Sequence, residues 1–501
     1  MSGIELLHPP AVRDARPALW HDGRWYSHRE LDERAAHLAA VLAAQGIGKG
    51  DRVAILAYNH LAHIDLLLAA PRLGFVFTPL NYRLSEAEQR ELMRRVAPRL
   101  MLADTHHAAT AAMLGAPVWS LDLHESRLAA APAAMTATAV SRDDIHMLLC
   151  TGGSTGIPKA ARITYRQILA NNRNTIEGWD LRADDCAIQA TPCFHAALNV
   201  FTTPLLALGG RIALLDQFEP GRYLQALEHS GATLMFMVPT MYQMLAEHPR
   251  FATADFSRVR WAISGGAPCP APLRERYAAR GLRFRQGYGM TEAGVNCFRL
   301  PLHEAQQHPD SVGYPLPYTQ AVIRHADGTL CADEEVGELT LAGEHVCAGY
   351  DGRDEEWRQV FIDGWLWTGD LARRDAAGRH FIVGRRKEMY ISGGENVYPT
   401  EVEAALAQLP GVAECAVVGV PDARWGEVGL AAVRLAAGTQ ADAQMLRSQL
   451  KQHLAGYKLP RHFLFLDELP KSGAGKLLKP EIRRIHERAS GGLHEGSHPR
   501  E

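Results

Sequence analysis

One nine-residue segment, Thr151–Lys159, combines residues that suit the binding of a polyphosphate. It reads TGGSTGIPK and so contains three hydroxyl groups, three glycines and one lysine. Glycines let the backbone approach an anion closely, hydroxyl and backbone N–H groups donate to phosphate oxygens, and the lysine adds positive charge. The segment is not a Walker P-loop, because no Gly-Lys pair is followed by Ser or Thr at the required spacing. We expect a phosphate-binding loop after the strand predicted by the apolar run 145–150, with a flexible surface turn as the alternative.

Five further segments carry glycine, hydroxyl and charged residues of the kind found in loops after the strands of open α/β sheets. Such sheets bind their ligands at these loops. Each segment alone is weak evidence, because a glycine-rich turn is common. The segments are 263–268 (ISGGAP), 286–292 (QGYGMTE), 367–370 (WTGD), 384–385 (GR) and 470–476 (PKSGAGK).

Helices and short apolar strands alternate through the part of the chain that must position these loops. Ser27 and Glu30 have the spacing of a capping box ahead of a helix, and Gly46 is placed to end that helix. Apolar runs that predict strands follow at 53–56, 211–215 and 233–238. Apolar strands between helices are typical of parallel sheets covered on both faces, so the predicted fold class is α/β.

The pattern changes near residue 384 and predicts a second, smaller domain. After a strand at 381–383, a helix is expected from Pro399 to about Leu409. The pattern that follows is a strand at 415–420, a turn at 421–422 and a strand near 430–433. We therefore predict an N-terminal domain over 1–384, a C-terminal domain over 385–488 and a disordered, polar tail over 489–501; residues 125–140 are expected to form a connection.

Composition excludes several classes of protein. The chain has 501 residues, of which 47% are hydrophobic and 22% charged, and a formal net charge of −3, which gives no electrostatic case for nucleic acid or an anionic membrane. Its eight cysteines show no CxxC pair and no metal-ligand spacing, as expected for reduced thiols. No secretory signal and no apolar run of about 18 residues is visible, so we expect a cytoplasmic protein without integral membrane association.

Taken in order, the segments resemble the motifs of the adenylate-forming superfamily, which includes acyl- and aryl-coenzyme A synthetases, peptide-synthetase adenylation domains and beetle luciferases. The resemblance runs from about residue 20 to residue 485 and is nearest to bacterial fatty-acyl- and aryl-coenzyme A ligases at 363–370 and 391–399. It implies a large N-terminal domain of stacked α/β subdomains plus a β-barrel-like subdomain, followed by a small mobile α+β domain.

The resemblance also implies a two-step reaction with ATP, Mg²⁺ and coenzyme A. A fatty or aryl carboxylate and ATP would give an acyl-adenylate and pyrophosphate, and coenzyme A would then give the thioester and AMP. One alternative is an enzyme that loads the acyl group onto a carrier-protein phosphopantetheine. Another is a catalytically silent nucleotide-binding protein. The sequence does not indicate which acid is used, or the oligomeric state.

The family's nucleotide site maps onto this chain residue by residue. The β and γ phosphates would be held by Thr151, Gly152, Gly153, Ser154, Thr155, Gly156 and Lys159. Thr155 and Glu292 would contact Mg²⁺, and a hydroxyl with a carboxylate suits this hard cation. The adenine slot, the stacking aromatic and the ribose and phosphate contacts would come from Gly265, Gly266, Ala267, Gln286, Gly287, Tyr288, Gly289, Met290, Thr291, Asp370, Ile382 and Arg385. Among these, Tyr288 would stack on the base and Asp370 and Arg385 would bind the ribose hydroxyls.

Lys476 is the predicted catalytic cation. Attack of a carboxylate on the α-phosphate places charge on non-bridging oxygens and on departing pyrophosphate, which a positioned ammonium stabilises. The resemblance makes Lys387 the hinge on which the small domain swings after adenylation. The coenzyme A arm would then pass the segment Ser392, Gly393, Gly394 and Glu395.

His195 bears on the class of acid. Amino-acid-activating relatives carry an aspartate there to pair with the substrate ammonium, so histidine argues against an α-amino acid. We predict that His195 gates the acyl channel, with a core histidine as the alternative. The predicted acyl pocket comprises His195, Asn199, Met237, Val238, Thr240, Gly289, Met290 and Gly294. The chain departs from the family pattern at Gly152, where serine is usual, and after His195, where it is one residue shorter.

Overall fold

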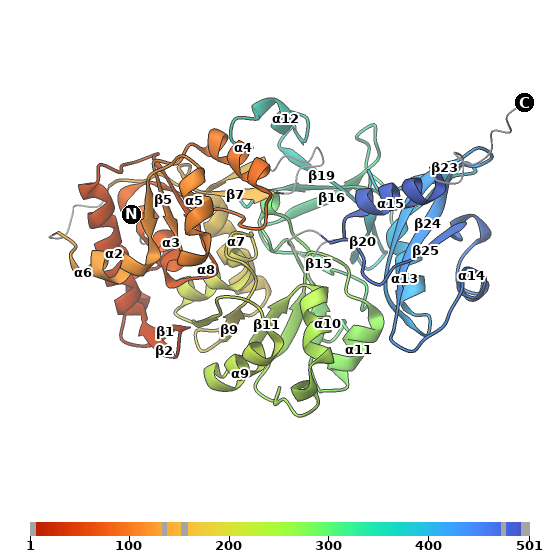
Figure 1. Ribbon diagram of the computed structural model, residues 1–501, viewed down its shortest axis with the longest axis horizontal. Helices are drawn as coiled ribbons and strands as arrows, with labels where there is room; N and C mark the ends of the chain where they lie inside the picture. The colour runs from red at the N-terminus through yellow and green to blue at the C-terminus, as the bar shows by residue number, and fades with distance from the viewer. Residues whose placement is uncertain (1–6, 133–137, 152–158, 472–476, 492–501) are drawn as a thin grey trace, which may run out of the picture. The chain divides into compact units, whose positions relative to one another are not determined.

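The computed structural model describes residues 7–132, 138–151, 159–471 and 477–491 (Figure 1). Its contacts divide the chain into two compact units. Unit 1 comprises residues 1–267, 277–322 and 340–367, and unit 2 comprises 268–276, 323–339 and 368–501. The domain boundary predicted after residue 384 stays a prediction.

Unit 1 contains a six-stranded sheet whose strands are parallel except for the last. Its order is β6 (Val118–Ser120), β5 (Leu100–Ala103), β3 (Arg52–Leu56), β4 (Val76–Pro79), β7 (Ile145–Thr151) and β8 (Lys159–Thr164). Among the helices of this region, α3 and α5 lie beside the sheet (Figure 1). The helices are α2 (His28–Ala44), α3 (Leu61–Leu73), α4 (Glu86–Val96), α5 (Ala108–Met113) and α6 (His124–Ala129). The capping box of Ser27 and Glu30 is confirmed at the start of α2, whereas α6 begins at His124 and runs into the expected connection 125–140.

A seven-stranded sheet completes the stacked α/β part of unit 1. Its order is β13 (Phe284–Gln286), β12 (Trp261–Ser264), β11 (Leu234–Met237), β9 (Cys186–Gln189), β10 (Arg211–Leu214), β1 (Pro17–His21) and β2 (Arg24–Ser27). The helices are α7 (Tyr165–Gly178), α8 (Leu198–Leu208), α9 (Pro220–Ser230) and α10 (Pro239–Glu247); the next helix along the chain, α11 (Ala271–Ala278), falls mostly within the stretch 268–276 of unit 2. One hydrophobic cluster contains residues of both large sheets, such as Phe77 and Ile263, so the two sheets share a core. The predicted α/β class is confirmed.

Two small sheets follow along the chain. The first pairs β14 (Phe298–Arg299) with β15 (Tyr314–Pro315). The second has the order β16 (Gln320–Arg324), β17 (Gly337–Ala342), β19 (Trp365–Arg374) and β18 (Phe361–Ile362), with β20 (His380–Arg385) paired to β19; α12 spans Asp354–Arg358. The expectation of loops at 367–370 and 384–385 was wrong, because the first segment lies within β19 and the second at the end of β20, and Asp370 pairs with Arg385.

The C-terminal part of unit 2 is a five-stranded sheet with α13 (Pro399–Ala407) and α15 (Lys479–Gly491) against β23 (Figure 1). Its order is β22 (Glu395–Val397), β21 (Tyr390–Ser392), β24 (Gly426–Leu435) and β23 (Val412–Asp422), with β25 (His462–Phe465) paired to β24; α14 spans Ala443–Leu450. The turn predicted at 421–422 was wrong: Asp422 still pairs with Gly426, so the turn comes later. Helix α15 also extends into the predicted tail.

Short 3₁₀ helices complete the described structure: Pro10–Val12, Thr105–His107, Leu121–Leu123, Pro249–Ala252, η5 (Thr291–Ala293) and Gly456–Lys458. All eight cysteines are free thiols. Within the described ranges, we find no helix with the length and apolar character that a membrane span requires.

His146 in β7 is expected to make the protein sensitive to acid. Burial lowers the pKa of this histidine to about 4 from an ordinary 6.5, so the folded state holds it neutral beside the Leu67 carbonyl. Between these pH values the unfolded chain binds more protons, so the free energy of unfolding falls as the pH is lowered, by about 2 kcal/mol from pH 6.5 to 5. The His146→Gln variant should lose this part of the pH dependence in urea unfolding followed by tryptophan fluorescence. An unchanged pH dependence would contradict the assignment.

Candidate active site

The two ends of the glycine-rich segment are direct partners across β7 and β8. Thr151 pairs with Lys159 in the antiparallel ladder, so the intervening residues join neighbouring strands. The predicted phosphate-binding residues Gly152, Gly153, Ser154, Thr155 and Gly156 lie outside the described residues, as does Lys476.

Lys159 lies against two side chains of the segment 350–356. Its Nζ is 2.7 Å from Glu356 Oε2 and 4.8 Å from the centroid of the Tyr350 ring. The hydrogen bond from Lys159 lowers the pKa of Glu356. An ammonium has three N–H donors, so Glu356 does not exhaust the capacity of Lys159 to bind phosphate oxygens.

The two segments predicted to line the adenine slot lie side by side. They follow the adjacent parallel strands β12 and β13, in which Ser264 pairs with Gln286, and Gly287 N donates to Ser264 O at 2.7 Å. A side chain at Gly265 would begin 3.1 Å from the Phe236 ring. Because these glycines carry no side chains, the backbone at the ends of β12 and β13 stays uncovered where a flat base would lie against it.

Gly289 is required by the loop that carries Tyr288 and Glu292. A Cβ at this position would lie 2.1 Å from the Val295 carbonyl oxygen, closer than any non-bonded contact allows. The close approach lets Cys297 N donate to Tyr288 O at 3.0 Å, and the Tyr288 ring packs edge-on against Phe298 with centroids 5.7 Å apart.

Glu292 is a buried carboxylate held by neutral groups. It is 7% exposed, and its Oε1 accepts from the Tyr350 hydroxyl at 2.9 Å. Its backbone carbonyl accepts from Cys347 N at 2.7 Å. Within the part of the chain that the structure describes, Glu292 forms no ion pair. A buried carboxylate without a cation is costly, so this side chain fits a hard divalent cation.

The predicted ribose-binding residues are neighbours in unit 2. Asp370 in β19 pairs with Arg385 in β20, and Arg385 Nε lies 3.3 Å from Asp370 Oδ1. Ile382 lies in β20, where it pairs with Ala372. A carboxylate and a guanidinium side by side offer an acceptor and donors for two adjacent hydroxyl groups.

The hinge candidate Lys387 and the coenzyme A segment also belong to unit 2. Lys387 is exposed in the turn between β20 and β21. Ser392 and Glu395 are the last and first residues of β21 and β22, joined by Gly393 and Gly394 with φ of +62° and +88°. Two consecutive positive φ angles form a tight hairpin turn that glycine adopts without strain.

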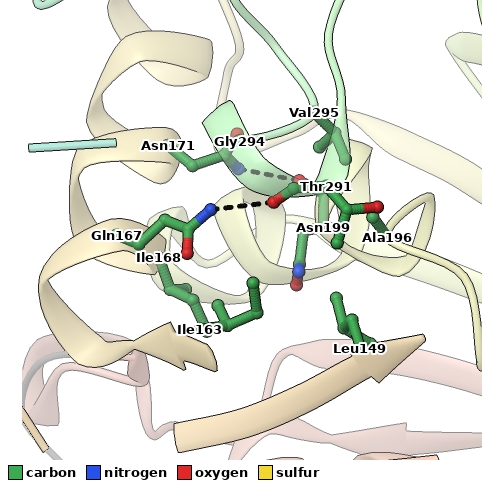
Figure 2. A pocket seen from close by; sticks show the side chains of 10 residues that line it. All are labelled: Leu149, Ile163, Gln167, Ile168, Asn171, Ala196, Asn199, Thr291, Gly294 and Val295. Atoms are coloured by element: carbon green, nitrogen blue, oxygen red, sulfur yellow. Dashed lines mark hydrogen bonds between the residues drawn. The ribbon is translucent and has the colours of Figure 1, made fainter. Parts of the chain in front are cut away.

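His195 lies half-buried in the turn before α8, with its ring 4.4 Å from that of Phe194. Close to it is a small cavity between α7, α8, β7, β8 and the segment after η5 (Figure 2). It is lined by Leu149, Ile163, Gln167, Ile168, Asn171, Ala196, Asn199, Thr291, Gly294 and Val295. Its volume of about 10 Å³ is the space of a single water, so an aryl ring does not fit.

Only two predicted acyl-pocket residues, Asn199 and Gly294, line this cavity. The other six, His195, Met237, Val238, Thr240, Gly289 and Met290, do not. Thus the structure does not gather the predicted acyl pocket around this cavity.

Three buried amides give the cavity its polar character (Figure 2). Gln167 Nε2 donates to Thr291 O at 3.0 Å, and Asn171 Nδ2 donates to Asn199 O at 2.9 Å. Carbonyl oxygens only accept, so these bonds fix the orientation of both amides. The oxygens of Gln167, Asn171 and Asn199 have no partner among the described residues. Gln167 thereby ties α7 to the loop that presents Glu292, a role that no sequence motif indicated.

Two family profiles match the chain. The profile described as AMP-binding enzyme matches residues 8–351, and the profile described as AMP-binding enzyme C-terminal domain matches residues 401–476.

Relatives and solved structures match over nearly the whole length. A feruloyl-CoA synthase from an Amycolatopsis species is 42% identical over 484 residues, which cover 95% of this chain and 96% of the relative. An indoleacetate–CoA ligase of Aromatoleum aromaticum is 33% identical, with 95% and 96% covered. The crystal structure of ATP-bound MatB from Rhodopseudomonas palustris is similar with a TM-score of 0.90 and 31% identity, over 97% of this chain and 99% of MatB.

Proposed function

This chain belongs to the AMP-binding enzyme family of acid–coenzyme A ligases, which activate a carboxylate as an acyl-adenylate, and from this premise we propose that its acid is an aryl carboxylate of the ferulate type. The observation that carries the proposal is the 42% identity to a feruloyl-CoA synthase over 95% of the chain. The indoleacetate ligase is 33% identical over the same share.

The first half-reaction joins the acid to AMP. The carboxylate oxygen attacks the α-phosphorus of ATP, and the bond to the bridging oxygen breaks as pyrophosphate leaves. Lys159 supplies charge to the phosphates, and Lys476 supplies it to the α-phosphate as negative charge develops there. Thr155 and Glu292 would hold Mg²⁺, which neutralises phosphate charge when bound. The buried carboxylate of Glu292, which forms no ion pair with any residue that the structure describes, supports this assignment.

Other residues bind and orient the nucleotide and the acid. The paired Asp370 and Arg385 would bind the ribose, and Tyr288 would cover the base beside the glycines of 265–266. His195 would stand at the entrance of the acyl channel. Fixing the carboxylate close to the α-phosphate converts a bimolecular step into an effectively unimolecular one.

The second half-reaction transfers the acyl group to a thiol. The sulfur of coenzyme A attacks the acyl carbonyl carbon, and AMP leaves with the oxygen that came from the acid. The glycine turn between β21 and β22 would let the pantetheine arm pass, and Lys387 would be the hinge that brings this turn to the adenylate.

The Lys387→Pro variant should therefore impair thioester formation far more than adenylation. Proline fixes one backbone dihedral, and a hinge residue needs that freedom to move between two states. Each half-reaction is measured in single turnover, the first as pyrophosphate release and the second from presynthesised acyl-adenylate. The Lys387→Ala variant, which keeps the backbone free, serves as the control. Equal loss in both half-reactions of Lys387→Pro would contradict a hinge at this residue.

A panel of acids tests the proposed substrate class. Pyrophosphate release from ATP and Mg²⁺ is followed with ferulic, cinnamic, long-chain fatty and short dicarboxylic acids, with and without coenzyme A. The proposal predicts the highest kcat/KM with the hydroxylated aryl acid, by about tenfold or more over the fatty acid, and an acyl-coenzyme A product. Acid-dependent pyrophosphate without a coenzyme A thioester would favour a carrier protein as acceptor. No release with any acid would contradict the proposal and favour a silent nucleotide-binding protein.

A further inference from the structure

Tyr350 lies between two charged residues of the proposed ATP site, and the backbone fixes its place. Its segment pairs with β8 through hydrogen bonds from Arg162 N to Gly349 O and from Asp351 N to Ala160 O, both 2.8 Å. Ala161 and Tyr350 form an antiparallel bridge. This pairing places Tyr350 beside the strand that begins with Lys159.

The hydroxyl of Tyr350 orients the carboxylate of Glu292. It donates to Oε1 at 2.9 Å, and both side chains are more than nine-tenths buried. A carboxylate oxygen only accepts, so the Tyr350 hydroxyl is the donor in this bond. The backbone of the Glu292 loop is held by the residues just before Tyr350, because Cys347 N donates to Glu292 O and His345 contacts Ala293 O. One oxygen of Glu292 is therefore fixed by Tyr350, which sets the direction of the other.

The ring of Tyr350 contacts the cation of Lys159. Nζ lies 4.8 Å from the ring centroid, within the range of cation–π attraction. The same ammonium also lies 2.7 Å from Glu356 Oε2. The ring is itself braced by Trp357, whose centroid is 5.4 Å away in an edge-to-face contact.

Resting on the proposed function, we propose that Tyr350 is a positioning residue that holds Glu292 with its hydroxyl and Lys159 with its ring, so that these opposite charges stay apart. If they paired with each other, the carboxylate would lose charge as a ligand for Mg²⁺, and the ammonium would give a second of its three N–H donors to a carboxylate, beside the one that Glu356 takes. The hydroxyl of Tyr350 thus serves the carboxylate that would bind Mg²⁺, and its ring serves the ammonium that would bind phosphate.

Two variants test the two halves of this proposal through nucleotide binding alone. The Tyr350→Phe variant keeps the ring but loses the hydroxyl, and Tyr350→Leu loses both. Binding of ATP is measured by calorimetry without acid or coenzyme A, once with Mg²⁺ and once with EDTA. Tyr350→Phe should weaken binding of Mg²⁺–ATP by about tenfold and leave metal-free ATP unchanged. Tyr350→Leu should also weaken metal-free ATP, because Lys159 loses its aromatic partner.

Tyr314→Phe is the matched control, because the hydroxyl of Tyr314 also donates to a carboxylate, Glu304 Oε2 at 3.0 Å, in a region outside the proposed site. It should leave both affinities unchanged. Equal weakening of Mg²⁺–ATP and metal-free ATP by Tyr350→Phe, or no weakening at all, would overturn the role of Tyr350. Failure of the proposed function would instead appear in the wild type, as absence of acid-dependent pyrophosphate release, so the two failures are distinguishable. Tyr350→Phe carries the test if Tyr350→Leu does not fold.

Discussion

Replacement of Lys476 by alanine is expected to lower the rate of acyl-adenylate formation by about 10²–10³-fold. The reason is electrostatic: the transition state places additional negative charge on the α-phosphate and on pyrophosphate, and no covalent step compensates for a missing cation. The two-conformation scheme adds a second expectation. Thioester formation from presynthesised acyl-adenylate should be nearly unchanged, because in this scheme the lysine would have left the site before that step.

Single-turnover measurements of the two half-reactions check this prediction. Lys471→Ala is a suitable control, because Lys471 is a second lysine of the same segment, 470–476, and forms its ion pair with Glu414 at 2.8 Å. It should affect neither half-reaction. If Lys476→Ala slows both half-reactions equally, Lys476 does not act in one conformation alone.

Replacement of Glu292 by glutamine is expected to lower adenylation by a similar factor, about 10²–10³. Glutamine has nearly the same shape and can still accept the hydroxyl of Tyr350, so the loop should keep its conformation. It lacks the negative charge that a hard divalent cation requires. The loss should therefore appear as a higher Mg²⁺ concentration for half-maximal rate, as well as a lower maximal rate.

The Mg²⁺ dependence of pyrophosphate release measures this effect, with thermal melting to verify folding. Glu304→Gln is the matched control, because Glu304 is also a carboxylate that accepts a tyrosine hydroxyl. A Glu292→Gln enzyme with the Mg²⁺ dependence of the wild type would show that this carboxylate does not bind the metal.

Local patterns were sufficient for much of the fold. The capping box at Ser27 depends on residues three apart, and it forms as expected. Short apolar runs such as 53–56 became buried strands, because a strand in a parallel sheet is covered on both faces. Strand ends were less predictable. Segment 367–370 was expected to be a loop, but it lies within β19, which pairs with β18 before this segment and with β20 from Asp370 onward.

In the candidate site too, residues that belong to a motif could be predicted, whereas a contact between segments distant in sequence could not. Asp370 and Arg385 could be paired from the family resemblance, and the ladder of β19 and β20 places them together. Tyr350 was missed because it lies 58 residues from Glu292 and belongs to none of the motifs. Its position depends on the pairing of its segment with β8, which no local pattern encodes. The predicted acyl-pocket residues also come from segments distant in sequence, and only Asn199 and Gly294 of them line the cavity near His195.

An isotope measurement tests the central claim, activation of the acid as an acyl-adenylate, most directly. A ferulic acid labelled with ¹⁸O in both carboxylate oxygens is incubated with the enzyme, ATP, Mg²⁺ and coenzyme A, and the products are analysed by mass spectrometry. If the carboxylate attacks the α-phosphate, AMP carries one ¹⁸O and the thioester keeps the other. Unlabelled AMP, or label in inorganic phosphate with release of ADP, would contradict the adenylate mechanism.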